Sequence, residues 1–333
     1  SRPSIIIAEI SGNHNGNKRL FLNLIKSAFK NGADMVKIQT YEPSDITLNK
    51  KNSVFKINKG IWKNKYLWEL YEKAHTPYSW HYDAFKFAKK NKKILFSSPF
   101  STKAVDFLEK FNVPIYKVAS FEITDLKLVD YIAKTKKPII LSTGMASYKE
   151  INQAIKTIKK YHSKIIILHC VSGYPTELKD TNLKKLKEIQ KKYSQYSIGV
   201  SDHTSEITSS VASSILGATV IEKHFKINNN LLTTDSKFSI TPNQLRELKK
   251  KIIDLWHSLN KGESTQTENV SKKMRRSIFA KKTIKKNEII TKKNIDTYRP
   301  KVGICASKYF KIMGKKARKN IKEGSPIKIE MLT

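Results

Sequence analysis

Eight short runs of apolar, mostly β-branched residues recur along the first 230 positions of the chain, and each run ends in polar residues. Apolar character without alternation is typical of strands that are buried on both faces, as in a parallel sheet. The runs occupy residues 5–10, 35–39, 94–98, 115–120, 138–143, 165–170, 196–203 and 218–225. Amphipathic stretches separate them, so the pattern predicts eight strands that alternate with helices.

Two of the predicted helices have recognisable starts. Ser147 stands three residues before Glu150, and Thr241 with Pro242 stands just before Gln244, in each case ahead of apolar residues at helical spacing. This arrangement is typical of a capping box, in which the first and fourth residues satisfy each other's backbone N–H groups. Both segments are therefore expected to begin helices.

Strands and helices that alternate over about 250 residues indicate a (β/α)8 barrel. The barrel is expected to occupy residues 1–261. Residues 262–274 are polar and are interpreted as a linker, and residues 275–333 have short apolar runs with Gly, Asn and Pro, as in a small β-rich domain.

The second domain contains an internal repeat. Residues 283–295 align with residues 320–332 at an offset of 37, which places Asn287 opposite Gly324. Both residue types tolerate a left-handed backbone conformation. Each copy is therefore predicted to form a strand, a tight turn and a second strand.

The polar residues that end the eight predicted strands are candidates for a site, because the carboxyl ends of barrel strands meet at one mouth. They are Glu9, Lys37, Gln39, Ser98, Lys117, Ser120, Glu122, Ser142, His169, Ser201, His203, Glu222 and His224. An insertion at about 41–75, with Trp62, Trp68 and Tyr71, is long enough to cover this mouth as a substrate wall.

Lys37 and Lys117 lie inside apolar runs, where an unpaired ammonium group is costly. One interpretation pairs each lysine with a carboxylate of a neighbouring strand, such as Glu9. The interpretation we favour is a pair of cations that holds a phosphate and a carboxylate, with nearby serines donating hydrogen bonds.

His203 and His224 end adjacent predicted strands, and imidazoles in such positions can share a divalent cation. Two histidines are also common as ordinary hydrogen-bonding residues. Glu222, from the same strand end as His224, makes a metal or acid–base role as plausible as the structural one.

The composition limits the partners. The chain has 57 Lys, 7 Arg and a net charge of +36, but the lysines are scattered rather than clustered, which favours a small anionic substrate over nucleic acid. The two cysteines, Cys170 and Cys305, have no metal-ligand spacing. No membrane span or signal peptide is recognisable, so a cytoplasmic protein is expected.

Seven motifs together resemble the sialic acid synthases. They are IAEISGNHNGN (7–17), GADMVKIQTY (32–41), FSSPF (96–100), YKVASFEIT (116–124), LSTGMAS (141–147), SDHT (201–204) and IEKHF (221–225). The C-terminal region around YRPKVGI resembles the antifreeze-like (SAF) domain of that family. Residues 61–81 and 235–240 resemble the pseudaminic acid branch.

The resemblance implies condensation of phosphoenolpyruvate with an acetamido sugar and water, giving a nine-carbon 2-keto acid and phosphate. It assigns phosphoenolpyruvate to Lys37, Ser98, Lys117, Ser120, Ser142 and Ser201, and proton transfer or water orientation to Glu9, Glu122 and Glu222. It further implies that His203 and His224 bind Mn²⁺ or Mg²⁺, which polarises the sugar aldehyde.

For the sugar, the resemblance points to Gln39, Tyr174, Asp235 and Arg299. Arg299 belongs to the SAF domain, which in the family inserts into the barrel of a partner subunit, so a domain-swapped homodimer is implied. The expected sugar is 2,4-diacetamido-2,4,6-trideoxy-altrose. The alternatives are a synthase of the neuraminate or legionaminate branch, and a protein without catalysis that binds anions or polysaccharides.

Overall fold

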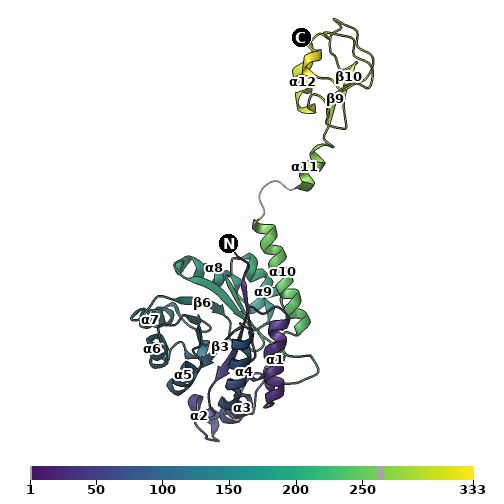
Figure 1. Ribbon diagram of the computed structural model, residues 1–333. Helices are drawn as coiled ribbons and strands as arrows, with labels where there is room; N and C mark the ends of the chain where they lie inside the picture. The colour runs from purple at the N-terminus through teal and green to yellow at the C-terminus, as the bar shows by residue number, and fades with distance from the viewer. Residues whose placement is uncertain (1, 261–265) are drawn as a thin grey trace. The chain divides into compact units, whose positions relative to one another are not determined.

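The computed structural model describes residues 2–260 and 266–333 and divides the chain into two compact units, 1–259 and 260–333. Each unit has its own hydrophobic core. Figure 1 shows the first unit as strands surrounded by helices and the second as a small domain with little regular structure.

The first unit is a closed barrel in which each strand pairs in parallel with the next and β8 pairs with β1. The strands are β1 (Ile5–Glu9), β2 (Met35–Thr40), β3 (Ile94–Pro99), β4 (Tyr116–Val118), β5 (Ile139–Ser142), β6 (Ile165–Cys170), β7 (Ser197–Asp202) and β8 (Val220–His224). All eight predicted strands are present, and the predicted (β/α)8 architecture is confirmed.

Amphipathic helices form the outer layer and bury their apolar faces against the strands. They are α1 (Lys18–Lys30), α4 (Tyr78–Lys90), α5 (Thr102–Glu109), α6 (Leu126–Lys134), α7 (Tyr148–Lys159), α8 (Leu183–Lys192), α9 (Thr208–Ile215) and α10 (Pro242–Asn260). The capping box of Ser147 and Glu150 begins α7 as predicted. Thr241 and Gln244 exchange the corresponding hydrogen bonds ahead of α10.

The insertion after β2 forms two further helices, α2 (Pro43–Ile46) and α3 (Leu67–Ala74). Both lie at the end of the barrel opposite the N-terminus of the chain (Figure 1). Because β1 starts near that terminus, this is the end at which the strands finish. The insertion therefore lies where the candidate site residues are expected.

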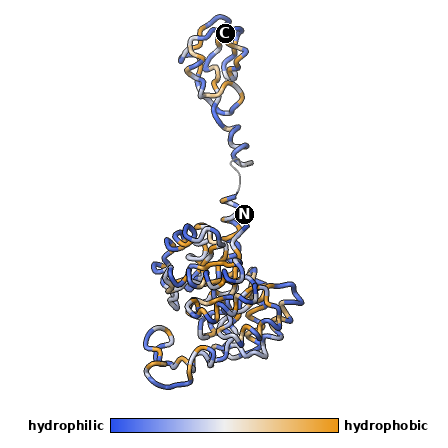
Figure 2. The backbone as a smooth tube through the Cα atoms, turned by 90° about the vertical axis from the view of Figure 1, so that its left-hand side faces the viewer, coloured by the Kyte–Doolittle hydropathy of each residue, from blue (hydrophilic) through white to orange (hydrophobic). Residues whose placement is uncertain are grey.

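The second unit begins with α11 (Gln266–Lys272), which lies within the stretch interpreted as a linker. That stretch is hydrophilic along α11 (Figure 2), yet part of it is helical rather than irregular. Residues 262–274 are polar, but a polar segment can still form a short helix. Residues 261–265 lie outside the part of the chain that the structure describes.

The core of the second unit forms around β9 (Ser277–Ala280) and β10 (Ile295–Tyr298), which pair in antiparallel fashion. Asn287 and Gly324 both have positive φ, as the repeat predicted. The predicted strand–turn–strand form of each copy is wrong. Instead the two copies pair with each other, because Ile284 and Ile321 exchange backbone hydrogen bonds of 2.8 Å.

Candidate active site

The barrel interior is built in layers. A lower layer is apolar and consists of Ile7, Phe96, Ile115, Ile140, Leu168 and Val220. Residues two positions apart on a strand share a face, so the next residues toward the mouth are Glu9, Ser98, Lys117, Ser142, Cys170 and Glu222. All six of these side chains are buried. The strand period therefore places a polar layer directly on top of an apolar one.

The polar layer is held together by ion pairs. The ammonium nitrogen of Lys37 lies 2.8 Å from Glu222 Oε1 and 3.0 Å from Glu9 Oε2. Lys117 Nζ lies 3.7 Å from the same Glu222 oxygen, and Ser201 Oγ donates to it at 3.0 Å. The two lysines thus lie close together, as the favoured interpretation expects. They are also paired with carboxylates of other strands, Glu9 and Glu222, as the alternative interpretation expects.

Burial and charge shift the pKa values of these groups. Burial lowers the pKa of Lys37 to about 7, against the attraction of Glu222. Burial alone would raise the pKa of Glu222, but the charges of Lys117 and Lys37 outweigh it and lower that pKa to about 2. Burial raises the pKa of Glu122 to about 7, partly opposed by Lys117. Glu222 is therefore ionised at neutral pH, whereas Glu122 can gain or lose a proton there.

Several polar atoms in the mouth lack a hydrogen-bond partner. Among the described residues, eight buried side-chain nitrogen or oxygen atoms are in this state. Six of them belong to predicted site residues: Glu9, Ser98, Glu122, Ser142, Glu222 and His224. Of these, Glu9 Oε2 keeps its ion pair with Lys37 at 3.0 Å, although the two groups are not aligned for a hydrogen bond. Because buried polar atoms in proteins are nearly always partnered, this concentration indicates a site shaped for a polar ligand.

Gly144, at the end of β5, brings backbone close to two serines. Its N–H donates to Ser120 Oγ at 3.1 Å. A Cβ at this position would lie 2.2 Å from Ser172 Oγ and 2.7 Å from Ser120 Oγ. Only glycine leaves room for both hydroxyl groups, so the loop after β5 completes one side of the polar layer.

The two candidate metal ligands lie side by side, with 5.3 Å between the ring centroids of His203 and His224. His203 Nδ1 contacts Val171 O at 3.0 Å and so carries the proton, which leaves Nε2 free to bind. His224 Nδ1 is buried without a partner, and burial together with His203 holds the pKa of His224 well below its usual value. Burial alone would lower the pKa of His203, but Cys170 and Val171 O outweigh it and raise that pKa, so a divalent cation would bind the neutral His224 and displace a proton from His203.

Among the described residues, the histidine pair has no third protein ligand. Within residues 2–260 and 266–333, no group of three His, Cys, Asp or Glu side chains is arranged to hold a metal ion. A cation held by two imidazoles leaves coordination positions for substrate or water, which is the arrangement of a catalytic rather than a structural site.

Three of the four predicted sugar residues, Tyr174, Asp235 and Gln39, belong to the mouth of the barrel. The ring of Tyr174 is 4.5 Å from that of His203. Asp235 is buried and accepts hydrogen bonds from Ser11 Oγ and, at 3.2 Å, from the N–H of Gly12. Gln39 follows Lys37 on the inner face of β2 and is paired in register with Ser98. Tyr174, Gln39 and Asp235 are thus on the mouth side of the polar layer.

The insertion also reaches this region. Trp62 Nε1 donates to Thr234 O at 3.2 Å, and the Trp62 ring lies 5.7 Å from that of Tyr174. Tyr71 packs edge-on against Tyr41 at 5.9 Å. Trp68 instead lines a cavity of about 240 Å³ within the insertion, together with Tyr66. Of the three aromatic residues named from the sequence, Trp62 is the one that contacts a predicted sugar residue.

Cys170 and Phe238 belong to the site but were not predicted from the sequence. Cys170 Sγ lies 3.8 Å from His203 Nδ1. Phe238, in a short helix at Ser236–Phe238, packs edge-on against His224 at 4.8 Å. Cys170 lies two residues after the inward-facing Leu168, so its inward direction could have been predicted from the sequence. Nothing in the loop sequence indicated the position of Phe238.

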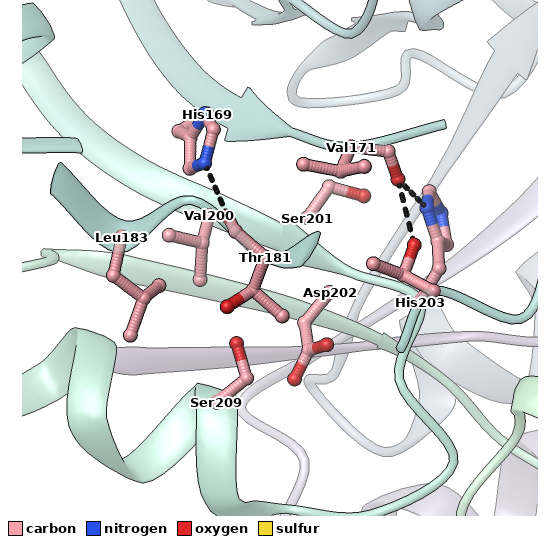
Figure 3. Close-up of a pocket in the computed structure, with 10 residues that line it drawn as sticks. His169, Val171, Thr181, Leu183, Val200, Ser201, Asp202, His203 and Ser209 are labelled. Atoms are coloured by element: carbon pink, nitrogen blue, oxygen red, sulfur yellow. Dashed lines mark hydrogen bonds between the residues drawn. The ribbon is translucent and has the colours of Figure 1, made fainter. Parts of the chain in front are cut away.

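His169 and Arg299 lie elsewhere. His169 is on the outer face of β6 and bonds Thr181 O at 2.9 Å, beside a cavity of about 20 Å³ with room for about one water (Figure 3). Arg299 is exposed in the second unit. The role predicted for Arg299 in the sugar site stays a prediction.

No helix in the described part of the chain combines the length and apolar character needed to cross a membrane.

Comparisons with known proteins agree with this geometry. Residues 24–264 match the NeuB family, and residues 275–333 match the SAF domain. The chain is 39% identical to a pseudaminic acid synthase of Helicobacter pylori, over 98% of this chain and 97% of that protein. It is 40% identical to a pseudaminic acid synthase of Campylobacter jejuni, over 97% and 95%. An N-acetylneuraminic acid synthetase structure from Leptospira borgpetersenii, solved with citrate, superposes with a TM-score of 0.72 at 29% identity, covering 81% of this chain and 90% of that one.

Proposed function

Because this chain belongs to the NeuB family, we propose that it is a pseudaminic acid synthase, which condenses phosphoenolpyruvate with 2,4-diacetamido-2,4,6-trideoxy-altrose and water. The observation that carries the proposal is the group of unpartnered polar atoms around Lys37 and Lys117 at the mouth of the barrel. A second observation is the identity of about 40% with pseudaminic acid synthases over nearly the whole chain.

In this proposal the two lysines bind the phosphate and carboxylate of phosphoenolpyruvate. Their present partners, Glu9 and Glu222, already balance their charge, so the substrate must share the ammonium groups with these carboxylates. Ser98 and Ser142 have free buried hydroxyls that can donate to the phosphate or carboxylate oxygens. Together these residues orient the substrate with its reactive carbon toward the histidines.

His203 and His224 would hold a divalent cation, Mn²⁺ or Mg²⁺, which acts as a Lewis acid toward the aldehyde of the open-chain sugar. Glu122 can hold a proton near neutral pH because its pKa is raised to about 7. It is therefore the carboxylate best suited to exchange a proton during water addition. Glu222 stays ionised and positions Lys37, Lys117 and Ser201.

Carbon–carbon bond formation joins C3 of phosphoenolpyruvate to the aldehyde carbon of the sugar, and water adds at C2. The tetrahedral species at C2 then loses inorganic phosphate, leaving the 2-keto acid. Tyr174, Gln39 and Asp235 would contact the sugar. Arg299 of a partner subunit would complete the site in a domain-swapped homodimer, and a reducing cytoplasm is the expected compartment because both cysteines are free.

The test is phosphate release from phosphoenolpyruvate with Mn²⁺ and either the diacetamido sugar or N-acetylmannosamine. Turnover that is faster with the diacetamido sugar supports the proposal. Preference for N-acetylmannosamine would move the protein to the neuraminate branch. The absence of phosphate release with every acetamido sugar, with salt-sensitive retention on a polyanion, would favour an anion-binding protein instead.

A further inference from the structure

One side of the barrel mouth is formed by four aromatic side chains, here termed the aromatic wall: Trp62, Phe121, Tyr174 and Phe238. Tyr174 is at its centre, with ring centroids 5.1 Å from Phe238, 5.7 Å from Trp62 and 6.5 Å from Phe121. The four residues come from four separate segments of the chain. The wall adjoins the predicted site, because Tyr174 lies 4.5 Å from His203 and Phe121 stands between Ser120 and Glu122.

Phe121 is the exposed member of the wall. It follows Ser120 and precedes Glu122 in a short helix at Ser120–Glu122, so it stands next to two predicted site residues. Its side chain is 61% exposed and stacks on Tyr174 with 21° between the ring planes. An exposed phenyl ring contributes little to folding, but it offers an apolar surface to a ligand.

Trp62 is held over the same region from the insertion. Its indole N–H donates to Thr234 O at 3.2 Å, which ties the insertion to the loop that carries Asp235. Its ring lies edge-on to Phe238 at 6.3 Å. The hydrogen bond satisfies the polar edge of the indole, so the faces of the ring remain for apolar contacts.

From this arrangement we infer that Phe121 and Trp62 determine which sugar the enzyme selects, by packing against its methyl groups. The inference rests on the proposed function. The diacetamido 6-deoxy sugar has two acetamido methyls and a C6 methyl, whereas N-acetylmannosamine has one acetamido methyl and a polar C6 hydroxyl. Burial of methyl groups against aromatic rings is favourable, so the wall favours the sugar with more of them. In the proposed function Lys37 and Lys117 hold phosphoenolpyruvate and do not distinguish the sugars.

The test compares steady-state kinetics of Phe121→Ala and Trp62→Ala with both sugars. For each variant we expect kcat/KM for the diacetamido sugar to fall roughly tenfold or more, the effect of losing a methyl-sized apolar contact in a pocket. The loss should come mainly from KM for this sugar, with KM for phosphoenolpyruvate unchanged and N-acetylmannosamine less affected. Phe121→Tyr should restore wild-type values. Tyr82→Ala, at a 53% exposed aromatic on α4, is the matched control and should change nothing.

An unchanged ratio of kcat/KM between the two sugars in both alanine variants would overturn the inference while leaving the proposed function intact. A wild-type protein without turnover would overturn the proposed function. Binding then gives a separate readout: the reduced, unreactive alcohol of the diacetamido sugar should change the tryptophan fluorescence of the wild type and not that of Trp62→Phe. An equal change in both proteins would also overturn the inference.

Discussion

The ammonium group of Lys37 lies 2.8 Å from the carboxylate of Glu222, although 185 positions separate the two residues in the chain. Both side chains are almost fully buried, and Glu9 and Lys117 complete the cluster. A buried ion pair is strongly destabilised when one partner is removed, because the other charge is left without compensation. The cluster therefore links the stability of the barrel to its predicted substrate site.

Lys37→Met should consequently reduce both stability and activity. We expect the free energy of unfolding to fall by roughly 3–5 kcal/mol, and phosphate release to become undetectable because a cation of the phosphoenolpyruvate site is lost. Urea unfolding and the phosphate assay measure the two effects. Lys18→Met, which breaks an exposed pair with Asp83, should alter neither. Wild-type activity in Lys37→Met would contradict the assignment.

Glu122 should make stability depend on pH. Its pKa is raised to about 7 in the folded protein, so between about pH 4.5 and 7 the folded state binds more protons than the unfolded state. The contribution of this group to stability therefore falls as the pH rises through that window, by at most about 3 kcal/mol. Glu122→Gln mimics the protonated form.

The expected result is that Glu122→Gln and wild type are equally stable near pH 4.5 and that the variant is the more stable one at pH 8. Urea unfolding at a series of pH values measures the difference in free energy of unfolding between the variant and wild type. The other titrating groups are common to both proteins, so their contributions cancel in this difference. The pH profile of kcat should also lose an inflection near 7 in the variant. A stability difference that does not change with pH would refute the raised pKa.

Gly144 should not tolerate a side chain. Gly144→Ala places a methyl group where Ser172 Oγ and Ser120 Oγ now lie, at 2.2 and 2.7 Å. We expect a higher KM for phosphoenolpyruvate, since the displaced Ser120 is one of its predicted ligands. The double variant Gly144→Ala with Ser172→Ala removes the closer clash and should recover part of the lost affinity. If the single variant behaves as wild type, the close packing of this loop has no role in binding.

Removal of divalent cations should abolish activity, and Mn²⁺ should restore it, because the imidazoles of His203 and His224 lie side by side as available ligands. Electron paramagnetic resonance of Mn²⁺ measures binding without turnover. Binding should be lost in His203→Ala and His224→Ala. His169→Ala is the matched control and should keep Mn²⁺ binding. His169 lies on the outer face of β6, away from the histidine pair, and its imidazole bonds Thr181 O. Full activity in EDTA would exclude the metal role of the histidine pair.

Arg299 should act in the site of a partner subunit. Arg299→Ala and Lys37→Met are each expected to be inactive alone. In a swapped dimer that contains one chain of each kind, one site has an intact lysine and an intact arginine, whereas the other site lacks both. Co-expression should therefore recover about a quarter of wild-type activity if the chains mix at random. No recovery would indicate that Arg299 acts within its own chain, and full activity of Arg299→Ala alone would show that it has no role in the site.

Much of the site could be predicted because strand parity is a local property. Once Ile7, Phe96 and Leu168 are placed in the barrel interior, the residues two positions later must point the same way. The prediction of Glu9, Ser98, Lys117, Ser142 and Glu222 as neighbours used the convergence of strand ends, and strand parity explains why these five residues do point inward. Cys170 obeys the same rule, but the cysteines were considered only as possible disulfide partners or metal ligands and not by their position on a strand.

The sequence by itself determined the number of strands and where each one ends in polar residues, because these features depend on the pattern of a few neighbouring residues. The tertiary structure decided which residues come together: Lys37 with Glu222, the backbone of Gly144 with Ser120, and Trp62 with Tyr174. Such contacts depend on the closure of the barrel and the paths of its loops, which combine constraints from segments far apart in the chain. The same reason explains why the repeat in the second unit revealed its turns but not the pairing of Ile284 with Ile321.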